Sequence, residues 1–183
     1  MFQLTIPNIL TLMRIALIPL LVVVYLLPFS WAMPVAAVLF IAAGLTDWLD
    51  GYLARKLNQT TAFGAFLDPV ADKLMVTVAL VLLVYKHPSL HLLIPSMIII
   101  GREITVSALR EWMAELGKRG SVAVSFVGKV KTTVQIVAIV FLLWFFPLYG
   151  MDTFTIGLWL LDIAAILTII SMIGYVKAAL RAN

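Results

Sequence analysis

The sequence predicts an all-α polytopic membrane protein, a six-transmembrane-helix bundle that forms one domain over residues 1–183. Hydrophobic residues make up 63% of the chain and charged residues only 12%, and the mean hydropathy is +1.11. A soluble domain is about half apolar and about a quarter charged. In addition, six stretches are long and apolar enough for a helix to cross a bilayer, which takes about 20 residues.

Short polar or proline-containing segments separate the six expected spans. The first span follows Pro7, which suits the first turn of a helix because its missing N–H needs no partner there. The turn at Pro28, the polar stretch 58–61, the loop at Pro88, the polar stretch 111–127 and the turn 147–152 end the spans that precede them. We expect spans at about residues 8–27, 31–56, 64–85, 91–112, 128–146 and 153–175.

Lys and Arg are unevenly divided between the two sets of connections. The connections at 55–64 and 112–128, with the C-terminal tail, carry Arg55, Lys56, Lys118, Arg119, Lys177 and Arg181. The opposite connections carry only Lys86. Because cytoplasmic loops are enriched in Lys and Arg, both chain ends should face the cytoplasm. The first apolar stretch lacks the basic segment and cleavage site of a secretory signal, so we expect it to remain as the first span.

The composition excludes several kinds of site. The chain has no cysteine, and its only histidines, His87 and His91, lie beside an expected loop, which argues against a zinc site. The net charge of +4 does not indicate nucleic-acid binding, because no soluble basic domain or basic run carries it. Any metal should therefore be a hard cation held by oxygen atoms.

Four of the nine acidic residues gather at the facing ends of the second and third spans. They are Asp47, Asp50, Asp68 and Asp72. Residues three or four apart share one face of a helix, so the two pairs should converge from antiparallel neighbours. Charges at membrane depth are costly unless they pair, bind an ion or line a polar cavity. Carboxylates suit Mg²⁺, Mn²⁺ or Ca²⁺, and we expect such a cation here. The alternative is a structural set of ion pairs with Arg55, Lys56 and Lys73.

The spacing Asp-x2-Asp-Gly-x2-Ala-Arg-x8-Gly-x3-Asp-x3-Asp resembles the signature of the CDP-alcohol phosphotransferases. All eight positions are present, as Asp47, Asp50, Gly51, Ala54, Arg55, Gly64, Asp68 and Asp72. The resemblance implies a homodimeric enzyme that moves a substituted phosphate from a CDP-linked donor to an alcohol and releases CMP. It implies Mg²⁺ or Mn²⁺ on the four aspartates and Asp72 as general base. It also places Gly51, Ala54, Arg55 and Gly64 at the CDP donor, although small residues also serve close helix packing.

Basic residues in and beside the fourth and fifth spans bear on the acceptor. Lys118 and Arg119 are most simply topology signals. A second set would bind the phosphate of a phosphorylated acceptor if it faces the bundle. This set is Arg102, Arg110, Lys129 and Lys131. Glu103 is placed to orient Arg102 by pairing.

Within the family, the sequence resembles the bacterial subgroup that makes phosphatidylglycerophosphate. The segments that carry this likeness are 6–14, 102–103, 109–114 and 128–132. The likeness implies CDP-diacylglycerol as donor, glycerol 3-phosphate as acceptor, the bacterial inner membrane as location, and Asn8 and Thr11 at the CDP group. Arg14 either joins them or extends toward the membrane surface.

Two other functions stay open at this point. The first is the same reaction with another acceptor, such as inositol phosphate. The second is a cation transporter, which predicts acids spread across the membrane rather than gathered at one end.

Asp162 in the sixth span has no assigned role beyond pairing with a base or lying near the outer edge.

Overall fold

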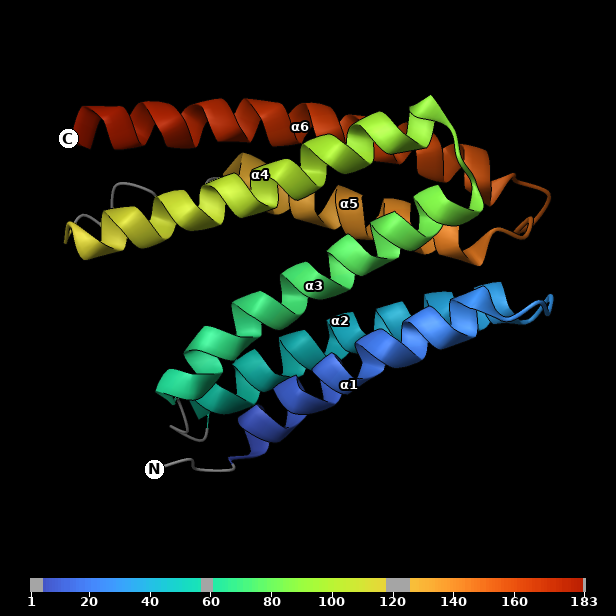
Figure 1. Ribbon diagram of the computed structural model, residues 1–183, viewed down its shortest axis with the longest axis horizontal. Coiled ribbons are helices and arrows are strands. Elements are labelled where there is room, and N and C mark those ends of the chain that lie inside the picture. The colour runs from blue at the N-terminus through green and yellow to red at the C-terminus, as the bar shows by residue number, and fades with distance from the viewer. Residues whose placement is uncertain (1–4, 57–60, 118–125, 183) are drawn as a thin grey trace.

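The computed structural model describes residues 5–56, 61–117 and 126–182, and the regular structure in this part is helical (Figure 1). The helices are α1 (Ile6–Leu26), α2 (Ala32–Lys56), α3 (Ala62–Lys86), α4 (Leu90–Glu115), α5 (Phe126–Trp144) and α6 (Thr153–Ala182). The predicted all-α class is confirmed. Five helices lie close to the expected spans, whereas α6 continues past the expected end at 175.

Local chemistry explains where several helices begin and end. The hydroxyls of Thr61 and Ser89 cap α3 and α4 by accepting hydrogen bonds from backbone N–H groups three residues further on. Gly117 ends α4 with φ of +72°, a left-handed conformation that favours glycine. Asp152 caps the start of α6, where its carboxylate accepts a hydrogen bond from the backbone N–H of Thr155. The hydrogen bonds from Thr155 lower the pKa of the Asp152 carboxyl.

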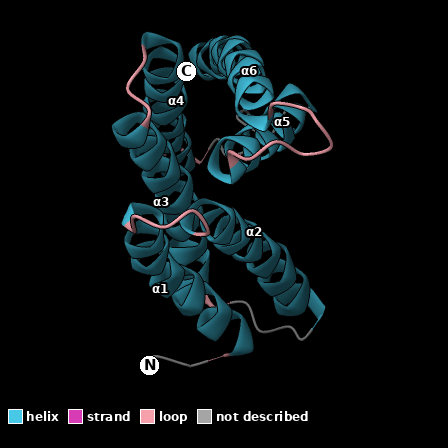
Figure 2. Ribbon diagram, turned by 90° about the vertical axis from the view of Figure 1, so that its right-hand side faces the viewer, coloured by secondary structure: helices cyan, strands magenta, loops and turns pink. Residues whose placement is uncertain are grey.

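The six helices form two groups of three. Figure 2 shows α1, α2 and α3 in one group and α4, α5 and α6 in the other. The groups meet mainly where α2 packs on α5 and where α3 crosses α4 and α5. The start of α1, the start of α3 and the end of α6 all lie at one end of the bundle, on the left of Figure 1. This end carries the acidic residues singled out by the sequence.

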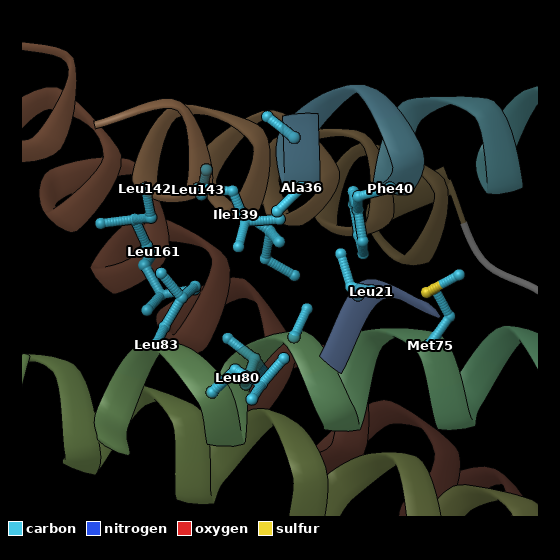
Figure 3. Close-up of a cluster of buried hydrophobic side chains, with 14 of the residues drawn as sticks. Leu21, Ala36, Phe40, Met75, Leu80, Leu83, Ile139, Leu142, Leu143 and Leu161 are labelled. Atoms are coloured by element: carbon cyan, nitrogen blue, oxygen red, sulfur yellow. The ribbon is translucent and has the colours of Figure 1, made fainter. Parts of the chain in front are cut away.

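The main apolar core joins the two groups at the opposite end of the bundle (Figure 3). Leu21 of α1, Phe40 of α2 and Leu80 of α3 meet Ile139 and Leu142 of α5 there, and all five are buried. The core is therefore closed toward the connections that precede α2, α4 and α6. The two groups separate toward the acidic end, where a cavity lined by acidic and basic side chains lies.

Among the described residues, four helical segments are long and apolar enough to cross a membrane. They are Ile6–Leu26, Ala32–Leu53, Leu90–Glu115 and Thr153–Lys177. The helices α3 and α5 are not among them; α3 carries Asp68, Asp72 and Lys73 within its length. An integral membrane protein is supported, and the count of six spans stays a prediction.

Asp162 has a partner far from the acidic end. His91 Nε2 lies 2.5 Å from Asp162 Oδ2, and the two side chains join the start of α4 to α6. Both residues line an otherwise apolar groove that also includes Trp159 and Pro95. His91 is therefore the base with which Asp162 pairs, one of the two positions expected for this acid.

Candidate active site

Arg14 of α1 lies between the two aspartates of α2. Its guanidinium group is 2.7 Å from Asp47 Oδ1 and forms an ion pair with Asp50 Oδ2. The Arg14 side chain is only 2% exposed, so it points into the bundle and not toward lipid. Pairing of this kind is the usual way to hold a charge at membrane depth. Within the described residues, the counter-charge of these acids therefore comes from α1.

Thr11, one turn before Arg14, connects the acids of α2 and α3. Its hydroxyl donates to Asp68 Oδ1 at 2.6 Å and lies 3.4 Å from Asp50 Oδ2. Asp50 and Asp68 therefore lie on two sides of one hydroxyl group. Thr11 is buried, so this arrangement is shielded from bulk solvent. The structure thus brings together one acid from each predicted pair, and the convergence of all four stays a prediction.

Asn8 ties the start of α1 to the start of α3. The Thr61 hydroxyl lies 3.0 Å from Asn8 Oδ1 and accepts the N–H of Gly64 at 3.0 Å. A Cβ atom at Gly64 would lie 2.7 Å from Asn8 Oδ1, which is too close for a carbon–oxygen contact. Glycine at this position therefore lets α1 approach α3 closely.

A cavity of about 410 Å³ opens between the two helix groups at the acidic end. Three of its acidic lining residues come from α2 and α3, namely Asp47, Asp68 and Asp72. Three basic lining residues come from α4 and α5, namely Arg102, Arg110 and Lys131. The cavity thus has an acidic wall on α2 and α3, which carries these three acids and Lys73, and a basic wall on α4 and α5. Two regions that lie far apart in the sequence form one site.

Glu103 organises the basic wall. Its Oε1 accepts from Arg102 Nη1 at 3.0 Å and forms an ion pair with Lys131 Nζ. Lys131 is 1% exposed and Arg102 is 8% exposed. With Arg110, the wall holds three cations and one anion, a surplus of two positive charges. That surplus matches a phosphomonoester dianion, and Arg binds phosphate through paired hydrogen bonds.

Other residues singled out by the sequence have different positions. Lys129 is exposed and does not line the cavity, because it lies about 200° around the helix from Lys131. Gly51 is half-buried in α2. Ala54 and Arg55 also belong to α2, but their side chains lie outside the described residues. A role for these three α2 residues at the CDP donor stays a prediction.

The structure adds cavity residues that sequence reasoning missed. Tyr175 of α6 and Gln135 of α5 line the cavity, and Ser171 of α6 bonds Arg102 Nη2 at 3.3 Å. Gln135 Oε1 is buried and has no hydrogen-bond partner among the described residues. The available signal was the four-residue spacing of Ser171 and Tyr175, which places both on one face of an apolar helix.

The donor chemistry of the acidic wall fits a divalent cation. Its ligands would be the carboxylate oxygens of Asp47, Asp50, Asp68 and Asp72, which Mg²⁺ and Mn²⁺ prefer. No group of three or more acidic or histidine side chains among the described residues is close enough to hold a metal ion. Arg14 and Thr11 hold Asp47, Asp50 and Asp68 instead. The metal therefore stays a prediction.

Comparison with known proteins identifies the family. The CDP-alcohol phosphatidyltransferase family model matches residues 4–175. The chain belongs to this family. It is 54% identical to a protein of Salmonella choleraesuis (strain SC-B67) and 52% identical to one of Escherichia coli (strain K12). Each comparison covers 97% of this chain and 96% of the relative, and both relatives are named CDP-diacylglycerol–glycerol-3-phosphate 3-phosphatidyltransferase.

In a CDP-alcohol phosphatidyltransferase, the contact at Gly64 has a testable consequence. Because Asn8 and Gly64 are both predicted to lie at the CDP donor, we expect Gly64→Ala to displace Asn8 and to raise the KM for the donor about 10-fold, which corresponds to about 1.4 kcal/mol. Gly44→Ala is the matched control, because a Cβ at Gly44 meets nothing within 4 Å. Steady-state kinetics with varied donor measures both. Equal KM values for the two variants would show that the close approach at Gly64 does not support donor binding.

Proposed function

We propose that the chain transfers the phosphatidyl group from CDP-diacylglycerol to the hydroxyl of glycerol 3-phosphate, with phosphatidylglycerophosphate and CMP as products. The observation that carries the proposal is the single cavity with an acidic wall facing a basic wall. The names and near-complete coverage of the relatives support the same reaction. The basic wall distinguishes a phosphorylated acceptor from a neutral alcohol such as serine, which would leave its surplus charge unmatched.

The reaction requires removal of one proton. The acceptor hydroxyl oxygen forms a bond to the phosphorus that carries diacylglycerol, and the bond from that phosphorus to CMP breaks. Asp72 takes the hydroxyl proton. Within the described residues the Asp72 side chain makes no hydrogen bond or ion pair, whereas the side chains of Asp47, Asp50 and Asp68 each have a partner. A carboxylate that is not held by the protein is the one best placed to accept a proton from substrate.

The remaining roles follow from position. Arg102, Arg110 and Lys131 bind the acceptor phosphate opposite Asp72. Asn8, Thr11, Gly51, Ala54, Arg55 and Gly64 belong to the donor side of this proposal. We include Mg²⁺ or Mn²⁺ on the four aspartates; when bound, such a cation neutralises charge on the donor pyrophosphate. The proposal also includes a homodimer in the bacterial inner membrane, with the cavity open to the cytoplasm.

One assay tests the reaction and the acceptor together. Purified protein receives CDP-diacylglycerol and Mg²⁺, and CMP release is measured with glycerol 3-phosphate, inositol phosphate or serine. We expect release only with glycerol 3-phosphate, and loss of release when EDTA replaces Mg²⁺. Absence of acceptor-dependent CMP would refute the transferase. Preference for inositol phosphate would show that glycerol 3-phosphate is not the acceptor. Preference for serine would refute the proposed role of the basic wall in binding a phosphate.

A further inference from the structure

Tyr175 of α6 contacts both arginines of the basic wall. Its hydroxyl accepts a hydrogen bond from Arg110 Nη2 at 2.8 Å. Its ring centroid lies 5.0 Å from Arg110 Cζ and 5.5 Å from Arg102 Cζ. Tyr175 is 4% exposed and lines the cavity. One aromatic side chain therefore holds two guanidinium groups that approach the same cavity from α4.

The two arginines depend on Tyr175 to different degrees. Arg102 is also held by Glu103 at 3.0 Å and by Ser171 at 3.3 Å. Among the described residues, every hydrogen bond and ring contact of the Arg110 side chain is made with Tyr175. A long Arg side chain samples many rotamers unless it is held. Tyr175 therefore fixes where the charge of Arg110 lies.

The Tyr175 ring also offsets the repulsion between the two arginines. Arg102 and Arg110 are like charges that contact the same ring, and Glu103 already pairs with Arg102 and Lys131. The negative face of an aromatic ring attracts cations without cancelling their charge. A carboxylate at this position would neutralise the surplus that a phosphate needs. A tyrosine holds the cations and leaves the surplus available.

We propose that Tyr175 is a positioning residue that sets the acceptor-phosphate site by holding Arg102 and Arg110. It deepens the proposed function and rests on it. The arrangement makes α6 a determinant of acceptor binding, since Ser171 and Tyr175 lie one turn apart on the face of α6 that meets α4. The ligand is a phosphomonoester, recognised by its two negative charges.

Tyr25 provides a matched control. It is also a buried tyrosine with a cation, Lys86, over its ring at 4.7 Å. Its hydroxyl has no hydrogen-bond partner among the described residues. It packs in the apolar core and does not line the cavity. Tyr25→Phe therefore removes a buried hydroxyl without touching the basic wall.

The test compares Tyr175→Phe, Tyr175→Leu and Tyr25→Phe by steady-state kinetics with each substrate varied. Tyr175→Phe keeps the ring and should raise the KM for glycerol 3-phosphate about 10-fold. Tyr175→Leu removes both contacts and should raise it about 50-fold. The KM for CDP-diacylglycerol and the kcat should stay within about twofold, and Tyr25→Phe should match the unaltered protein.

Inorganic phosphate gives a second readout of the same site. Its inhibition constant against glycerol 3-phosphate should rise in parallel with the KM in the Tyr175 variants. An unchanged KM and inhibition constant in Tyr175→Phe would overturn the proposal, and so would equal losses for both substrates. Tyr175→Phe decides the question if Tyr175→Leu does not fold. If the unaltered protein releases no CMP with glycerol 3-phosphate, the proposed function fails instead.

Discussion

The Asp72→Asn variant is expected to lose turnover by about 10²- to 10⁴-fold, because an amide cannot accept the proton of the acceptor hydroxyl. Asp72 lines the cavity, and within the described residues it is bonded to no other side chain. Asn is close to Asp in size, so the change leaves the shape of the cavity intact. Donor binding should therefore persist, and titration with CDP-diacylglycerol under conditions without acceptor measures it.

The matched control is Asp162→Asn, the same exchange at an acid that pairs with His91 outside the cavity. This variant should retain most of its turnover. Asp72 has two implied roles, base and cation ligand, and the variant separates them. Loss of donor binding equal to the loss of turnover would make Asp72 chiefly a ligand. Turnover near that of Asp162→Asn would remove Asp72 from the chemistry.

Much of the fold follows from local sequence signals. Pro28 and Pro88 lie in the connections where α1 and α3 end, and Thr61 and Ser89 supply the hydroxyls that begin α3 and α4. These signals act within one turn of a helix, so neighbouring residues in the sequence are enough to identify them. The length of α6 was missed because its last turns are less apolar than a span needs to be, yet they still form helix.

The shared face of Asp47 and Asp50 was also predictable, but the partner of that face was not. The spacing of Asp47 and Asp50 places both on one face of α2. Nothing in that spacing says which helix meets the face. The structure shows that α1 does, through Arg14 and Thr11. Contacts between helices far apart in the sequence depend on how the whole bundle packs. The spacing of residues within one helix does not predict these contacts.

The basic residues show the same limit on a smaller scale. Lys129 and Lys131 are two residues apart and look equivalent as charges in a sequence. On α5 they point in different directions, and only Lys131 lines the cavity. Tyr175 was overlooked for the opposite reason, because an aromatic residue near the end of an apolar helix is typical of a membrane-interface anchor. Its contacts with Arg102 and Arg110 are visible only once α4 and α6 are packed together.

Arg14→Met is the second change with a large expected effect. Arg14 is buried and is the described counter-charge of both Asp47 and Asp50. Removal of one partner from a buried ion pair costs about 3–5 kcal/mol, because the remaining charge is left uncompensated. In EDTA we expect the unfolding midpoint to fall by about 6–20 °C in this 183-residue chain. Thermal unfolding in detergent measures it.

Added Mg²⁺ should then distinguish two explanations of the acid cluster. If the aspartates are cation ligands, loss of the Arg14 charge strengthens cation binding, and binding to the folded state raises the unfolding midpoint. Mg²⁺ should therefore raise the midpoint of Arg14→Met more than that of the unaltered protein. Arg110→Met is the matched control, since Arg110 has no acidic partner among the described residues and its loss leaves no carboxylate unpaired.

The outcome bears on why Arg14 lies where it does. An arginine that only stabilises the bundle would leave Arg14→Met unstable with or without Mg²⁺, and the cation would have no special effect on it. An arginine that occupies the place of a cation would give a variant whose stability depends on Mg²⁺ concentration. Equal midpoints for Arg14→Met and Arg110→Met in EDTA would contradict both, because the two aspartates would then need no counter-charge from α1.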